Sequence, residues 1–297
     1  MNILPVIETH DLSKRFGNTS AVCNLTMSVA AGSITGFLGL NGAGKTTTIK
    51  MLLGMISPTG GGGTILGYSI RDPAESLAIR RRVAYVSESQ RLYDYMTVAQ
   101  IVRFTKSFHS GWRSDVEESL LRSWALPLNQ KVKALSKGMR RKLALLLAFA
   151  RKPELLILDE PSDGLDPVGV EQLLEAMVAQ CGEGTAVFFS SHQIAEVERV
   201  ADRVCIIHKG QLVMNASLDD LRESYRQIDI VFGAAPNEAE FQIPGVERIQ
   251  AQGCQMRVLV SGNAEQVVAR ARMHDVNSIE VAPIGLREMF LDRVKEN

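Results

Sequence analysis

The segment Gly39–Thr46 places three glycines, a lysine and a threonine in the order Gly-x-x-x-x-Gly-Lys-Thr. Glycine lets the backbone wrap closely around a polyphosphate, so that successive N–H groups face the negative charge. Lys45 would reach the outer phosphates and the Thr46 hydroxyl would ligate Mg²⁺. A glycine-rich turn is the alternative, but the position between an expected strand and an expected helix favours a phosphate loop. The predicted nucleotide-binding residues here are Gly39, Asn41, Gly42, Ala43, Gly44, Lys45, Thr46 and Thr47.

A second segment, Leu155–Glu160, is an apolar run that ends in two carboxylates. In open α/β sheets ligands bind beyond the carboxyl ends of the strands, so Asp159 is placed to hold the water shell of a metal ion. Glu160 follows directly and is placed to polarise an attacking water. Alone, the segment reads equally well as a polar strand end before Pro161. Its co-occurrence with the phosphate loop favours the catalytic interpretation.

The elements that must position these residues follow from the hydrophobic pattern. Residues 155–158 and 186–189 are continuous apolar runs, which are typical of strands buried on both faces, and residues 33–38 are strand-like and lead into the glycine-rich turn. Residues 90–150 show helical spacing, and Pro58 with Gly60–Gly63 indicates a turn before a strand at 64–66. The pattern predicts an α/β fold: a phosphate-loop NTPase core, a mainly parallel sheet and a helical subdomain at about residues 90–150.

A smaller unit is expected after this core. Residues 228–232, 246–250 and 256–260 have strand-like patterns, and 263–273 and 286–294 have helical ones. We therefore divide the chain into a nucleotide-binding domain at 1–222 and a small α+β accessory domain at 223–297.

Composition narrows the choice of partners and compartment. The 297 residues carry 33 basic and 33 acidic side chains, which argues against nucleic-acid binding through a broadly basic surface. The longest apolar stretch is far shorter than the roughly 18–20 residues that span a bilayer, and the N-terminus does not read as a signal peptide. The chain is expected in the cytoplasm.

The segment Leu135–Met139 reads Leu-Ser-Lys-Gly-Met and opens a helical pattern rich in leucine and alanine. Alone, Ser136 is simply a good helix N-cap. Lying between the phosphate loop and the carboxylate strand, the segment resembles the signature sequence of ABC transporter ATP-binding subunits. The chain resembles that family over about residues 6–215, and its ending resembles the bacterial export-type members. The resemblance implies ATP sandwiched between two head-to-tail monomers, with Ser136 and Gly138 of one contacting the γ-phosphate held by the other.

Other positions match the family in order. Residues 160–167 resemble the end of the metal strand and the loop that crosses the dimer interface, where Asp166 counts among the nucleotide-binding positions. His192 follows an apolar strand at the place of the family's γ-phosphate-contacting histidine. Phe16 holds the place of the aromatic residue that stacks on adenine, although a phenylalanine is also an ordinary core residue.

Two departures stand out. Glu88 occupies the position where the family usually has a glutamine that contacts Mg²⁺, and a carboxylate there adds negative charge beside Asp159 and Glu160. Gln90 is the alternative if the loop shifts by two residues. The signature also carries Lys137 and Met139 in place of the commonest glycine and glutamine.

The resemblance implies an ATPase, with Glu160, His192 and Lys45 as catalytic residues and Thr46, Glu88 and Asp159 as ligands of Mg²⁺. Its partners would be a second ATPase subunit, identical or paralogous, and a separate transmembrane permease that the subunit powers, for export, from the inner face of the membrane. The permease would dock beside residues 91–96, which read equally well as core of the helical subdomain. Alternatives are a soluble ABC ATPase without a permease and an ATP-gated regulatory module. The signature segment disfavours a phosphate-loop kinase.

Overall fold

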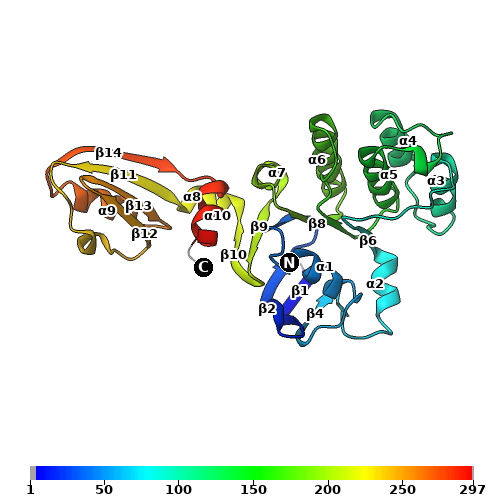
Figure 1. Ribbon diagram of the computed structural model, residues 1–297, viewed down its shortest axis with the longest axis horizontal. Helices are drawn as coiled ribbons and strands as arrows, with labels where there is room; N and C mark the ends of the chain where they lie inside the picture. The colour runs from blue at the N-terminus through cyan, green and yellow to red at the C-terminus, as the bar shows by residue number, and fades with distance from the viewer. Residues whose placement is uncertain (1–4, 296–297) are drawn as a thin grey trace. The chain divides into compact units, whose positions relative to one another are not determined.

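The computed structural model describes residues 5–295, which divide into two compact units at the boundary between Asn215 and Ala216 (Figure 1). Each unit has its own sheets and its own hydrophobic core. The expected boundary at residue 222 lies within helix α8 (Leu218–Ser224), which the structure assigns to the second unit. Among the described residues, no helix combines the length and the apolar character needed to cross a bilayer.

A six-stranded sheet with the order β10-β9-β3-β8-β7-β6 forms the centre of the first unit. Its strands are β3 (Ile34–Leu38), β6 (Val83–Val86), β7 (Leu155–Asp159), β8 (Ala186–Ser191), β9 (Arg203–His208) and β10 (Gln211–Ser217). Strand pairs β6–β7, β7–β8, β8–β3 and β3–β9 are parallel. Every residue of β3, β7 and β8 is buried, which explains why these strands are mainly apolar and do not alternate with polar residues.

A four-stranded antiparallel sheet with the order β2-β1-β4-β5 lies outside the predicted parallel pattern. Its strands are β1 (Ile7–Phe16), β2 (Thr19–Val29), β4 (Gly60–Ile65) and β5 (Tyr68–Ser69). The expectation of a turn at Gly60–Gly63 is wrong, because these glycines form strand β4. An added Cβ at Gly61 would lie 2.1 Å from the Asp11 carbonyl oxygen, and at Gly63 2.4 Å from that of Glu8. Close packing against β1 therefore requires glycine at positions 61 and 63.

Helices flank the central sheet, with α1 on one side and α6 and α7 on the other (Figure 1). The helices of this unit are α1 (Lys45–Leu52), α2 (Ser76–Arg82), α3 (Val98–Lys106), α4 (Ser114–Ser123), the 3₁₀ turn η1 (Val132–Ala134), α5 (Lys137–Phe149), α6 (Pro167–Gly182) and α7 (Ile194–Val200). The helical subdomain consists of α3, α4, η1 and α5. The Thr97 and Gln100 side chains form a capping box at the start of α3.

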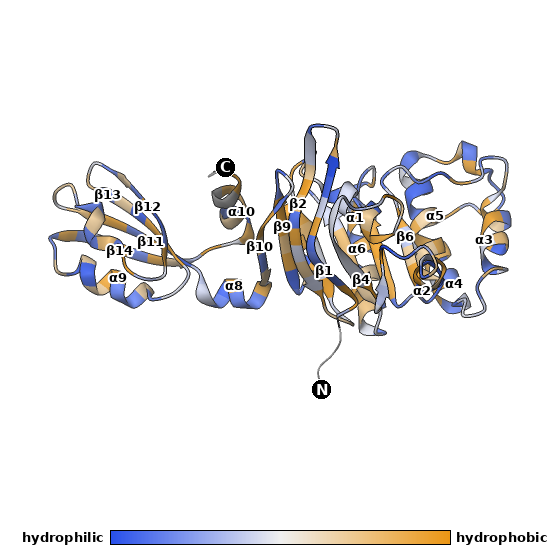
Figure 2. Cartoon of the chain, turned by 90° about the horizontal axis from the view of Figure 1, so that it is seen from below, coloured by the Kyte–Doolittle hydropathy of each residue, from blue (hydrophilic) through white to orange (hydrophobic). Residues whose placement is uncertain are grey.

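The second unit is a four-stranded antiparallel sheet with the order β12-β13-β11-β14. After α8 its elements are β11 (Arg226–Phe232), the 3₁₀ turn η2 (Glu238–Phe241), β12 (Val246–Gln252), β13 (Gln255–Val260), α9 (Ala264–Ala271), β14 (Val276–Pro283) and α10 (Leu286–Lys295). Its core contains Ile228, Phe232, Phe241, Val258 and Val267. Burial alternates along β11, and strands β11 to β13 carry both polar and apolar colours in Figure 2, whereas β9 is mainly apolar. Strand β14 was not predicted, because none of its residues is buried.

Candidate functional site

The turn between β3 and α1 has the shape that its glycines suggest. Gly42 and Gly44 adopt φ angles of 79° and 111°, which side-chain-bearing residues rarely adopt. A Cβ added at Gly44 would lie 2.6 Å from the Ala21 carbonyl oxygen, and one at Gly39 would lie 2.6 Å from that of Ile207. The glycines therefore allow both the conformation of the loop and its contact with neighbouring backbone.

Lys45 is the first residue of α1, and its side chain is almost fully buried. Its Nζ donates hydrogen bonds to the carbonyl oxygens of Gly39, at 2.6 Å, and Leu40, at 3.2 Å. The same Nζ lies 3.0 Å from Glu160 Oε1. The loop carbonyls and one carboxylate thus hold the lysine charge at the mouth of the phosphate loop.

Glu160 follows β7 with a φ of 47°, a left-handed conformation that costs a side-chain-bearing residue about 1–3 kcal/mol. Its backbone N–H donates to Ser190 Oγ at 2.9 Å, and its Oε2 lies 2.9 Å from His192 Nδ1. Because β7 and β8 are paired neighbours, Glu160 and His192 emerge side by side. Lys45, Glu160 and His192 therefore form a continuous polar chain, and each contributes a side chain to the same cleft.

Asp159, the last residue of β7, is 1% exposed. Its Oδ1 accepts a hydrogen bond from Ser190 Oγ at 2.7 Å, whereas its Oδ2 is buried with no hydrogen-bond partner among the described residues. Burial raises the pKa of the nearby Tyr85 hydroxyl to about 12, and the negative charges of Asp159 and Glu88 contribute to this rise. An unsatisfied carboxylate oxygen is a suitable ligand for a hard cation such as Mg²⁺.

An open cleft of about 530 Å³ lies at the phosphate loop, and the predicted Gly39, Ala43 and Asp159 are not among the described residues that line it. It is lined by Ala21, Leu40, Asn41, Gly42, Gly44, Lys45, Thr46, Thr47, Glu88, Glu160, Asp163 and His192. Glu88 therefore faces the predicted nucleotide site, while Gln90 turns back and accepts hydrogen bonds from the N–H and Oγ of Ser87. Asp163 was not singled out from the sequence. The sequence shows that Asp163 lies three residues after Glu160, but it does not show that the Asp163 side chain lines the cleft.

Ser136, Gly138, Asp166 and Phe16 are not among the described residues that line this cleft. Ser136 Oγ accepts from Met139 N–H and caps α5, and Asp166 Oδ1 accepts from Gly169 N–H and caps α6. Gly138 packs closely against the next loop, since an added Cβ would lie 2.9 Å from the Gly164 carbonyl oxygen. Phe16 is half exposed at the end of β1.

Arg141 on α5 is a buried residue that the sequence analysis missed. Its guanidinium donates to the carbonyl oxygens of Ser87, at 2.7 Å, and Glu88, at 2.6 Å, and burial lowers its pKa. Near the start of α5, Lys137 Nζ lies 2.7 Å from Asp163 Oδ2 and holds the pKa of that carboxyl below its usual value. Helix α5 is thus tied to the two loops that carry Glu88 and Asp163.

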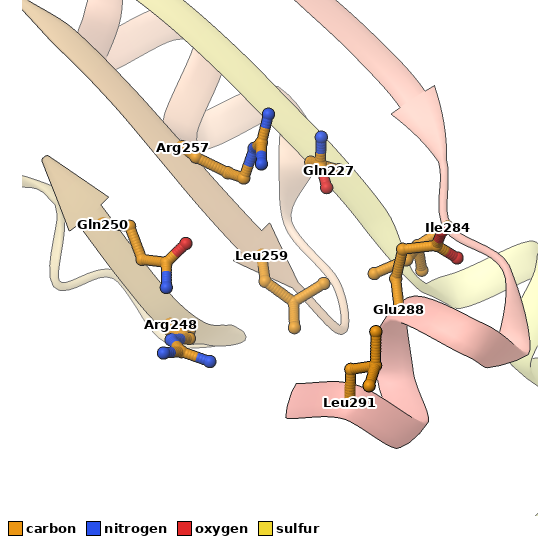
Figure 3. Close-up of a pocket in the computed structure, with 8 residues that line it drawn as sticks. All are labelled: Gln227, Arg248, Gln250, Arg257, Leu259, Ile284, Glu288 and Leu291. Carbon is orange, nitrogen blue, oxygen red and sulfur yellow. The ribbon is translucent and has the colours of Figure 1, made fainter. Parts of the chain in front are cut away.

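The second unit has a smaller cleft, of about 180 Å³, between its sheet and α10 (Figure 3). It is lined by Gln227, Arg248, Gln250, Arg257, Leu259, Ile284, Glu288 and Leu291. Arg257 Nε lies 2.7 Å from Asp229 Oδ1, and both side chains are exposed. The sequence analysis predicted no chemistry for any of these residues.

Several known proteins are similar to this chain. A family model described as ABC transporter matches residues 22–163. An uncharacterised ABC transporter ATP-binding protein, YhaQ of Bacillus subtilis, is 37% identical over 95% of this chain and 96% of its own length. The chain belongs to the ABC transporter ATP-binding family. It is an ATP-binding ATPase subunit of such a transporter, as the sequence analysis predicted.

Two further likenesses extend this assignment. The Nod factor export ATP-binding protein I of Rhizobium etli is 31% identical over 97% of this chain and 93% of its own length. A solved ATP-binding subunit of an ABC transporter is 34% identical, covers 73% of this chain and 92% of its own, and aligns with a TM-score of 0.67. The predicted phosphate-loop core with its helical subdomain is therefore confirmed.

Proposed function

We propose that this subunit and a second copy, or a paralogue, close around two MgATP molecules and reopen after hydrolysis. This cycle drives a separate transmembrane permease that exports its cargo. The subunit then works in the cytoplasm, on the inner face of the membrane. Because a ligand shifts a conformational equilibrium only by its differential affinity, ATP must bind the closed pair more tightly than the open one.

The observation that carries the proposal is the chain Lys45–Glu160–His192 at the phosphate loop. In the proposed mechanism Lys45 and the loop N–H groups of Gly42 and Gly44 bind the phosphates and stabilise the charge that develops during transfer. Glu160 orients a water in line with the γ-phosphate and accepts its proton, while His192 holds a γ-phosphate oxygen. Phosphate binding draws Lys45 away from Glu160, which leaves that carboxylate available for the water.

Mg²⁺ fits the residues present. Thr46 lines the cleft, and Asp159 offers a buried carboxylate oxygen without another partner among the described residues. Glu88 supplies a further carboxylate at the cleft wall. When bound to these groups and to the phosphates, the ion neutralises phosphate charge.

The position of the signature segment supports a second ATPase subunit. Ser136 is exposed at the N-terminus of α5, a 13-residue helix. The N–H groups at the start of a helix favour an anion, and Ser136 does not line its own subunit's cleft. Ser136, Gly138 and the nearby Asp166 therefore complete the nucleotide site of the partner, and Phe16 stacks on the adenine held by its own subunit.

An exposed aromatic cluster supports the permease partner. Ring centroids are 5.9 Å apart for Tyr93 and Tyr95, 5.6 Å for Tyr93 and Phe104, and 5.0 Å for Phe104 and Phe108. These rings are 50%, 68%, 39% and 69% exposed in the order Tyr93, Tyr95, Phe104 and Phe108. Exposure on this scale is typical of an interaction surface and not of the subdomain core.

The similarity to a protein named for Nod factor export supports the outward direction of transport. The experiment is fractionation of the tagged chain from its native cell, followed by detergent extraction and pull-down. We expect recovery with membranes, release by an alkaline wash and a co-purifying multi-spanning protein. Recovery only in the soluble fraction or on ribosomes would exclude the permease partner.

A further inference from the structure

A buried carboxylate behind the nucleotide site has no part in the mechanism described so far. Glu196 lies in the first turn of α7 and is 5% exposed. Burial raises the pKa of its carboxyl above the usual value, and the hydrogen bonds from Ser162 and Ser191 offset only part of this rise. Burying a titratable group costs free energy unless hydrogen bonds compensate, and Glu196 makes two such bonds.

One oxygen of Glu196 joins two loops. Its Oε2 accepts hydrogen bonds from Ser162 Oγ at 2.9 Å and from Ser191 Oγ at 3.0 Å. Both serines are buried. The other oxygen, Oε1, is buried without a hydrogen-bond partner among the described residues. The bridge therefore uses a single acceptor atom.

The two serines flank the two groups that meet in the cleft. Ser162 lies two residues after Glu160, and Ser191 lies directly before His192. Glu160 and His192 are themselves 2.9 Å apart. The Glu196 bridge thus joins the same two loops that the Glu160–His192 contact joins.

Helix α7 provides a fixed base for this bridge. Val197, next to Glu196, is fully buried, and an added Cβ at Gly36 would lie 2.5 Å from Val197 Cγ1. Gly36 belongs to β3, which leads directly into the phosphate loop. Since only glycine permits so close an approach, α7 is held tightly against the strand that positions the phosphates.

We propose that Glu196 is a positioning residue, which sets the distance between Glu160 and His192 by bridging Ser162 and Ser191. It touches neither the nucleotide nor the attacking water. The inference rests on the proposed roles of Glu160 and His192 in hydrolysis.

The test compares Glu196→Ala, Glu196→Gln and Glu198→Ala in the full chain. We expect Glu196→Ala to lower kcat for ATP hydrolysis about 10- to 100-fold, the scale of a small misplacement of reacting groups. The KM for ATP should stay within about threefold, because the phosphate loop is unchanged. Glu196→Gln should recover most of kcat, since its carbonyl oxygen can accept both hydroxyl hydrogen bonds. Glu198→Ala, on the same helix, should match the wild type.

Rates are expressed per ATP-binding site, measured by nucleotide titration, so that a loss of folded protein does not count as a loss of kcat. An unchanged kcat in Glu196→Ala would overturn the proposal. A loss of kcat in Glu196→Gln as large as that in Glu196→Ala would also overturn it, because the negative charge of Glu196, and not its hydrogen bonds, would then be what hydrolysis requires. Ser162→Ala combined with Glu196→Ala should be no slower than Glu196→Ala alone, and additive losses would contradict the bridge. Glu160→Gln and His192→Ala are measured in parallel. Wild-type turnover in both would refute the proposed mechanism itself, independently of Glu196.

Discussion

The two units contain charged pairs of similar type in opposite environments. In the first unit, Lys45 and Glu160 form an ion pair whose side chains are 6% and 9% exposed. In the second unit, Arg257 and Asp229 form a pair of similar length whose side chains are 57% and 38% exposed. Burying a charged pair is energetically unfavourable unless further hydrogen bonds compensate, and Lys45 has them from two loop carbonyls.

The difference shows which pair a ligand can use. A desolvated lysine and carboxylate exchange strong interactions with an incoming phosphate, because water does not screen them. An exposed pair is already hydrated and contributes little. We therefore expect substitutions in the first cleft to change nucleotide chemistry and the corresponding substitutions in the second to leave it unchanged.

The largest effect should come from Lys45→Ala. Removal of one partner from a buried, hydrogen-bonded charge pair costs about 2–5 kcal/mol, and here the partner in the bound state is the phosphate. We expect the binding free energy of ATP to weaken by that amount, measured by equilibrium binding of a fluorescent ATP analogue. Lys50→Ala, an exposed lysine on the same helix, serves as the control. Equal affinity in Lys45→Ala and the wild type would contradict the phosphate-loop assignment.

His192→Ala should affect the chemical step more than binding. Loss of one group that stabilises transition-state charge typically lowers kcat by about 10²-fold or more. We expect that loss in steady-state hydrolysis, with a KM for ATP close to the wild-type value. His274→Ala, which removes a histidine from the second unit, should leave kcat unchanged. A rise in KM with a normal kcat would assign His192 to ground-state binding only.

One glycine in each unit allows the two units to be compared by their free energies of unfolding. Gly44 in the phosphate loop and Gly253 in the second unit both have positive φ, but only Gly44 has a close neighbour, the Ala21 carbonyl oxygen. Gly253→Ala should cost about 1 kcal/mol of unfolding free energy from left-handed strain, and Gly44→Ala about 2 kcal/mol or more. Denaturant unfolding of the two variants measures the difference. Similar costs would mean that the loop relaxes around the added methyl group.

The smallest effect should come from Arg257→Ala. Exposed ion pairs contribute about 0.2–1 kcal/mol, so the free energy of unfolding should fall by no more than that. ATP hydrolysis by the variant should equal that of the wild type. A clear loss of hydrolysis would show that the second cleft acts on the first, and the contrast between the two units would fail.

Local sequence predicted the parts of the site that lie on one continuous segment. The phosphate loop and the pair Asp159–Glu160 lie at the ends of strands whose apolar pattern is visible, so parallel strand order was enough to bring them together. The role of His192 was predicted from the resemblance to the family. Arg141 and Glu196 were missed because their contacts are distant in the chain. Arg141 reaches Ser87 across 54 positions, and Glu196 reaches Ser162 across 34. The glycines of β4 were taken as a turn for the same reason, since it is packing against strand β1 that requires Gly61 and Gly63.

The most direct test of the account is a comparison of Glu160→Gln with the wild type in ATP binding and hydrolysis. Glutamine keeps the size of the side chain but replaces one acceptor oxygen with an NH2 donor and cannot accept the proton of water, and general-base catalysis typically contributes about 10²–10⁴-fold. The account predicts that Glu160→Gln binds ATP, stays dimeric with it and turns over at least about 100-fold more slowly. Turnover at the wild-type rate would contradict the catalytic role of this cleft.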